Sequence, residues 1–135
     1  MGAPFDPYAT LVHLREDGRA ETVPWTPDAF RRLLTGDRDH VIGTKHGLVP
    51  ADFHADEWEM HPAGDEVLYL LTGALDVVLE EPAGERAVEL RGGQGCLVPR
   101  GVWHRLVLAQ PSDLLFITPA RGTRHRPVGA AATDG

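Results

Sequence analysis

The chain has 135 residues, a length that fits one domain with one core. Its formal net charge of −7, from 20 acidic and 13 basic residues, argues against nucleic-acid binding, because contact with phosphates needs a clustered basic face. No apolar run is long enough to span a membrane and the N-terminus lacks the regions of a signal peptide, so we expect a soluble, cytoplasmic protein without nucleic-acid or membrane partners.

The first forty residues are predicted to form an N-terminal region, 1–40, made of an arm, an edge strand and one short helix. Residues 11–14 alternate weakly and suggest the strand. The helix is expected over 26–36, because Thr26 is a good N-cap, Pro27 suits the first helical position and Gly36 is a typical terminator. Arms of this kind often pack across a partner subunit, so we expect a homodimer.

From Val41 onward the apolar residues recur with period two, and glycine or proline interrupts them about every eight to twelve residues. This rhythm is typical of an all-β sandwich or barrel, which we expect over 41–120. A C-terminal tail, 121–135, is expected to be disordered toward its end. The predicted strands are 40–44, 57–61, 66–71, 74–80, 87–90, 95–98, 103–109 and 113–118.

Alternation on these strands places polar side chains in apolar rows, because residues two apart on a strand point the same way. Glu59 and His61 share one face. Two further rows each pair a polar residue with leucines: Glu66 with Leu68 and Leu70, and His104 with Leu106 and Leu108. A buried carboxylate without a partner is costly, so Glu66 needs a cation, a donor or solvent.

His61, Glu66 and His104 are the two histidines and one carboxylate that a mononuclear metal site needs. The single cysteine, Cys96, excludes an intrachain disulfide and a thiolate zinc cluster. The alternative is that the histidines are hydrogen-bonded core residues. His54 is out of phase with His61 and is expected in a loop.

The spacing of these residues resembles the motifs of the cupin superfamily of small β-barrels. His61, Glu66 and Gly73 match the latter part of the first motif, G-x5-H-x-H-x(3,4)-E-x6-G. Gly93, the Pro99–Gly101 segment and His104 match most of the second, G-x5-P-x-G-x2-H-x3-N. The resemblance covers roughly 41–118 and implies an antiparallel jelly-roll barrel that binds a divalent metal through His61, Glu66 and His104.

Three positions depart from the family pattern: Glu59 replaces the first histidine, Phe53 the opening glycine and Leu108 the closing asparagine. If Glu59 also binds, two imidazoles and two carboxylates would suit iron(II), manganese or zinc, with nickel also conceivable and copper less suitable. If it does not, the other three leave positions open for substrate and oxygen on iron(II). Without any metal, the same groups could form a polar ligand pocket or an acid–base pair.

Two classes of function follow from the resemblance. The enzyme hypothesis is a metal-dependent protein acting on a small organic substrate, as a dioxygenase or as a Lewis-acid isomerase or lyase, with Glu59 or Glu66 as catalytic base. The binding hypothesis is a cupin that senses or stores a metal or metabolite without turnover. In both, the leucine rows would shape the ligand pocket: Leu68, Leu70, Leu106 and Leu108.

Overall fold

The computed structural model describes residues 2–34 and 39–129. It confirms an all-β, antiparallel fold with one short α-helix. In chain order the elements are β1 (Thr10–Leu14), β2 (Ala20–Pro24), α1 (Pro27–Leu34), β3 (His40–Gly47), the 3-10 helix η1 (Pro50–Phe53), β4 (Glu57–Met60), β5 (Glu66–Glu81), β6 (Gly84–Arg91), β7 (Gln94–Val98), β8 (His104–Pro119) and β9 (Arg124–Pro127).

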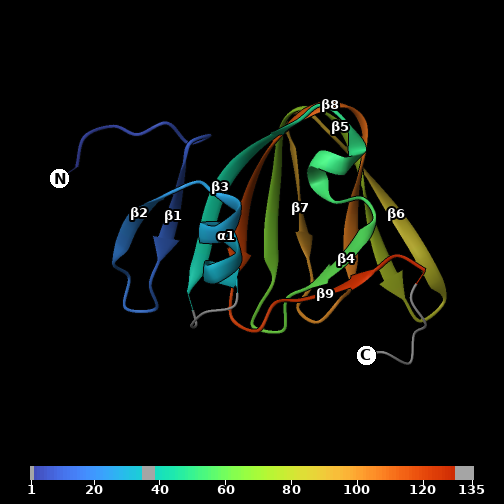
Figure 1. Ribbon diagram of the computed structural model, residues 1–135. Coiled ribbons are helices and arrows are strands. Elements are labelled where there is room, and N and C mark those ends of the chain that lie inside the picture. The colour runs from blue at the N-terminus through green and yellow to red at the C-terminus, as the bar shows by residue number, and fades with distance from the viewer. Residues whose placement is uncertain (1, 35–38, 130–135) are drawn as a thin grey trace.

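Two long strands, β5 and β8, hold the fold together. Each was expected as two strands, but each runs unbroken through a bend and so takes part in two layers. The first half of β5 pairs with β7 and the second half with β6, and both halves pair with β8. β8 in turn pairs with β3 at one end and β4 at the other. Figure 1 shows both strands arching over the top of the molecule.

The bend in β5 depends on Gly73. Its φ of +98° lies in the left-handed region, and a Cβ there would collide with Ser112 Oγ and the Pro111 carbonyl on β8. The pairing register between β5 and β8 also shifts here. Glycine at this position therefore lets the two strands cross from one layer to the other while still in contact.

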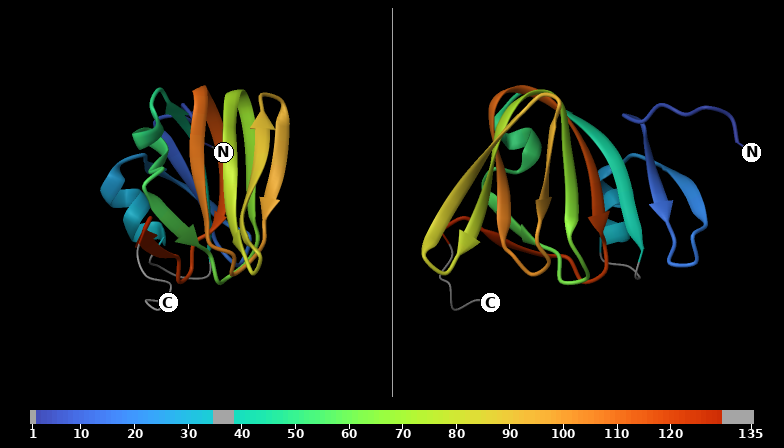
Figure 2. Two further views of the ribbon diagram at one scale, coloured as in Figure 1. Left: turned by 90° about the vertical axis from the view of Figure 1, so that its right-hand side faces the viewer. Right: turned by 180° about the vertical axis from the view of Figure 1, so that it is seen from behind.

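The helical elements lie on one side of the strands, as Figure 2 shows. Thr26 caps α1 by accepting a hydrogen bond from Ala29 N at 3.1 Å, as predicted. The expected terminator Gly36 lies outside the described residues. β2 and β9 were not predicted. β9 belongs to the expected tail and pairs with β4, while the end of that tail, 130–135, lies outside the described residues.

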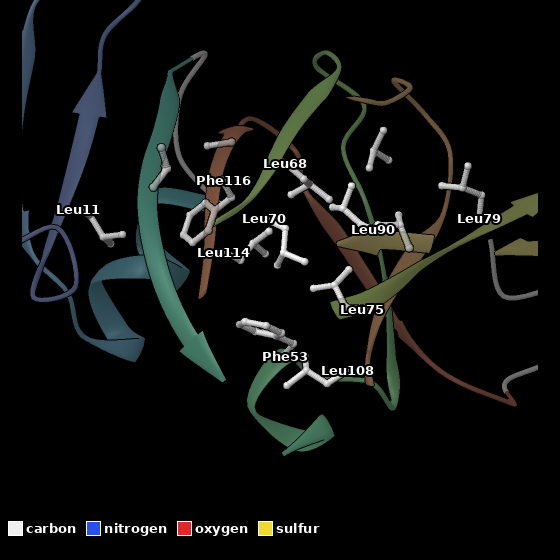
Figure 3. Close-up of a cluster of buried hydrophobic side chains, with 14 residues drawn as sticks. Leu11, Phe53, Leu68, Leu70, Leu75, Leu79, Leu90, Leu108, Leu114 and Phe116 are labelled. Carbon is white, nitrogen blue, oxygen red and sulfur yellow. The ribbon is translucent and has the colours of Figure 1, made fainter. Parts of the chain in front are cut away.

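The core lies between the two layers and is mostly aliphatic. Leu68, Leu70 and Leu75 from β5 meet Leu114 and Phe116 from β8 (Figure 3). Across the described residues, the strand pairings do not close the sheet into a ring. No helix in the described part of the chain is both long and apolar enough to cross a membrane.

Candidate metal centre

Four side chains from separate segments converge at one end of the core. Glu59 lies on β4 and His61 directly follows that strand, while Glu66 and His104 are the first residues of β5 and β8. The strand register brings them together, because Glu59 is the Cα partner of His104. One potential ligand atom from each of the four lies within 4.8 Å of the other three.

The distances between donor atoms suit a single ion. His61 Nε2 lies 2.9 Å from Glu59 Oε1 and 3.2 Å from Glu66 Oε2. His104 Nε2 lies 3.1 Å from Glu66 Oε1 and 3.8 Å from Glu59 Oε1. Ligands bound at about 2.0–2.2 Å to one ion are themselves roughly 3–4 Å apart, so one donor atom from each of these four residues would need only a small movement to bind it.

Burial and mutual charge set the protonation of the cluster. His61, Glu66 and His104 are almost wholly buried, whereas the Glu59 side chain is 26% exposed. Burial alone would lower the pKa of His61, but the adjacent Glu59 and Glu66 carboxylates raise it to about 10. Burial would raise the pKa of Glu66, yet contacts with His104 and His61 lower it well below its usual range. The cluster thus holds ionised carboxylates in a buried position.

Hydrogen bonds on the outer side of the cluster orient His61 and Glu66. Thr123 Oγ1 donates to the Ala120 carbonyl at 3.0 Å, so its remaining contact with His61 Nδ1, at 2.9 Å, is as an acceptor. Nδ1 then carries the proton, and the lone pair of a neutral His61 is on Nε2, facing the cluster. Thr118 Oγ1 donates to Glu66 Oε2 at 2.6 Å.

His125 on β9 is a contact of the site that sequence reasoning missed. Its Nε2 lies 2.7 Å from Glu59 Oε2. The hydrogen bond to Glu59 raises the pKa of His125, although burial partly opposes it. Burial would raise the pKa of Glu59, but contacts with His125 and His61 hold it far below its usual range. In the sequence, the available signal was one histidine in the short polar run Arg124–Pro127.

A pocket of about 590 Å³ opens onto the cluster. Leu68 and Leu106 line it together with Glu59, Glu66 and His104, and His54 contributes from the loop after η1. The other predicted pocket residues, Leu70 and Leu108, lie in the hydrophobic core and not among the lining residues. Four aromatic side chains also line the pocket: Trp25, Phe30, Phe53 and Phe116.

The donor set fits a divalent ion. Two ionised carboxylates neutralise it, and oxygen and imidazole ligands suit iron(II), manganese(II) and zinc. Buried polar atoms are normally hydrogen-bonded. Within the described residues, His61 Nε2 is completely buried and has no hydrogen bond of good geometry. A metal ion would bind Nε2 of the neutral imidazole and take the place of the proton that the raised pKa of His61 puts there in the metal-free protein.

A family model described as Cupin domain matches residues 48–118, more than half of the chain. These residues contain all four donors of the cluster but neither Thr123 nor His125. No curated protein matches the chain.

Several solved structures resemble the chain at low identity. A cupin-2 domain containing protein from Shewanella frigidimarina is 21% identical, with 70% of this chain and 80% of that chain covered and a TM-score of 0.48. Hydroxypropylphosphonic acid epoxidase from S. wedmorenis, solved with fosfomycin, is 18% identical, with coverages of 58% and 43% and a TM-score of 0.48. Hydroquinone 1,2-dioxygenase from Sphingomonas sp. TTNP3, with 4-hydroxybenzoate bound, is 19% identical, with coverages of 65% and 64% and a TM-score of 0.48.

The chain spans less than half the length of the epoxidase chain.

Proposed function

Because the chain belongs to the cupin domain family, we propose that it holds a divalent metal ion through His61, Glu66 and His104, with Glu59 as a fourth ligand, and acts there on a small organic substrate. The observation that carries the proposal is the convergence of four donor atoms within 4.8 Å around a buried imidazole nitrogen that no hydrogen bond satisfies. Iron(II), manganese(II) and zinc suit this ligand set best, and nickel is the next candidate.

A bound ion would supply Lewis acidity or, as iron(II), the electron exchange that dioxygenase chemistry needs. The side chains of the protein position the ligands and shape the pocket. Thr118 and Thr123 fix Glu66 and His61, so their donor atoms need little reorganisation on binding. Trp25 and Phe53 line the pocket beside the cluster and would shield a bound substrate from water.

We propose ligand roles for both carboxylates of the cluster. A carboxylate whose pKa is held low is a weak base, which disfavours Glu59 and Glu66 as the general base predicted from sequence. His125 carries a proton more readily, because Glu59 raises its pKa, and it lines the same pocket. We propose that the proton on His125 Nε2, which faces Glu59 Oε2 at 2.7 Å, holds Glu59 in position as a ligand.

Metal analysis tests the proposal directly. Wild-type protein reconstituted with iron(II), manganese(II), zinc or nickel and then desalted should retain about one equivalent of at least one of them. His61→Ala and His104→Ala should lose it while staying folded by circular dichroism. His54→Ala is the matched control, because His54 lines the same pocket outside the four-donor cluster. Wild-type protein that retains none of the four metals would overturn the metal site.

Oxygen consumption then tests the reaction class. Iron(II)-loaded protein should consume dioxygen in the presence of an enolic or catecholic compound from a small panel, and His104→Ala should not. A protein that keeps its metal and binds compounds of the panel without turnover would be a binding or sensor cupin.

A further inference from the structure

One wall of the pocket carries an inward-pointing cation, Lys45. It lies on β3 between Gly43 and Gly47, and residues two apart on a strand face the same side. A Cβ at Gly43 would lie 2.6 Å from the ring of Phe116, and one at Gly47 would lie 3.1 Å from the ring of Phe53. This face of β3 is therefore packed against aromatic rings, with the lysine side chain between them.

Aromatic rings surround the ammonium group. Lys45 Nζ lies 5.9 Å from the centroid of the Trp25 ring and 5.8 Å from that of Phe53. Trp25 stacks on Phe30 at 5.1 Å, and Phe30 meets Phe116 edge to face at 5.5 Å. All of these side chains line the same pocket as Glu66 and His104. The rings form an apolar part of the pocket wall, and the Lys45 ammonium lies beside them.

Lys45 differs from the other cations of the pocket in having no anionic partner. Arg31 pairs with Asp28 at 3.4 Å, and Arg105 Nη2 pairs with Glu85 Oε2 at 3.7 Å. For Lys45, residues 2–34 and 39–129 provide no ion pair and no side-chain hydrogen bond. Its ammonium is thus left with cation–π contacts alone in this part of the chain.

Asp52, the acid whose charge acts on Lys45, is engaged elsewhere. Its Oδ2 accepts hydrogen bonds from Leu48 N at 2.8 Å and Val49 N at 3.1 Å. Burial lowers the pKa of Lys45, and the charge of Asp52 only partly opposes this. Within the described residues this half-buried ammonium lies among aromatic rings and makes no ion pair, and a carboxylate on a ligand would provide one.

We propose that Lys45 binds the carboxylate of a small, flat aromatic or conjugated acid, whose rings lie among Trp25, Phe30 and Phe53. Lys45 is the Cα partner of Leu114, and Thr118, four residues further along β8, holds Glu66. At about 3.3 Å per residue this is roughly 13 Å along the strand. The substrate therefore carries its carboxylate at one end and the group that meets the metal cluster at the other. Only the placement of the second group at the metal cluster rests on the proposed function.

Binding of two matched probes to metal-free protein tests Lys45 separately from the metal site. 2-Naphthoate and 2-naphthamide have nearly the same shape and differ in charge. Wild-type protein should bind the naphthoate about tenfold or more tightly than the amide, the scale of one charge-assisted hydrogen bond. Lys45→Met should lose this preference, and Lys45→Arg, which keeps the charge, should retain most of it. Circular dichroism shows whether each variant is folded.

Equal affinities for the two probes, no binding of either at millimolar concentration, or a preference that persists in Lys45→Met would each overturn the proposal. Because the protein is metal-free, the carboxylate cannot owe its affinity to a bound ion. A chain that binds no metal but shows the Lys45-dependent preference would lose the proposed function and keep this inference. Lys45 is the only lysine of the chain, so after reductive ¹³C-methylation its resonance should also shift with naphthoate and not with the amide.

Discussion

Replacing Thr118 by valine removes a hydrogen bond that supports the metal cluster but leaves all four cluster residues in place. The hydroxyl donates to Glu66 Oε2 at 2.6 Å, and both residues are almost wholly buried. Valine fills nearly the same volume, so the substitution removes the hydrogen bond and leaves no cavity. In the variant, Glu66 Oε2 stays buried, so the free energy lost when it leaves water is no longer offset by the hydrogen bond from Thr118.

Hydrogen bonds to charged groups contribute about 1.5–3 kcal/mol, so metal-free Thr118→Val should be about 2 kcal/mol less stable than wild type at pH 7. For a chain of this length that corresponds to a fall in Tm of about 6–10 °C. The affinity for the retained metal should also fall, by about 10–100-fold, because Glu66 is no longer held in position.

Thermal unfolding followed by circular dichroism and competitive metal titration measure the two effects. Thr44→Val is the matched control, since Thr44 is equally buried but lies outside the pocket lining. If Thr118→Val matched Thr44→Val in both Tm and metal affinity, the hydrogen bond would not support the cluster and the reasoning would be refuted.

Other changes should have distinct effects. Thr123→Val removes the acceptor of His61 Nδ1 and should weaken metal binding about tenfold, with the Glu59 contacts unchanged; an unaltered titration would contradict this. Because the pKa of His61 is raised to about 10, metal uptake at pH 7.5 should release about one proton, measured by calorimetry in two buffers of different ionisation enthalpy. The same raised pKa stabilises the metal-free fold. This contribution is fully present at a pH below about 6.5, the pKa of histidine in the unfolded chain, so the free energy of unfolding should fall as the pH rises from there toward 10. Gly73→Ala should prevent folding or cost more than about 3 kcal/mol, whereas Gly84→Ala, with positive φ but open space around it, should cost about 1–2 kcal/mol by urea unfolding.

The sequence predicted those strands and those cluster residues whose local pattern agrees with the structure. Period-two alternation located most strands, and strand phase put His61, Glu66 and His104 on inward faces. The bends in β5 and β8 were predicted as breaks, because glycine in Leu71–Ala74 and proline in Gln110–Ser112 resemble turns locally. In the structure, pairing between the two strands continues through both bends with a shifted register.

The parts that sequence reasoning missed depend on contacts between distant residues. β9 has no apolar alternation, and its pairing with β4 is what makes it a strand. His125 and Thr123 therefore gave no local sign that they contact Glu59 and His61. The same limit applied to Lys45, whose inward direction depends on the rings opposite Gly43 and Gly47.

The position of β9 also bears on the order in which the protein assembles. The hydrogen bonds that support the cluster join residues 52, 62 and 66 positions apart along the chain. Contacts over such separations close large loops, and those involving the segment around β9 cannot form until that segment has left the ribosome. The unfolded chain thus offers a metal ion scattered ligands, and we expect ion capture to come after the strands have paired, as one of the last events of folding.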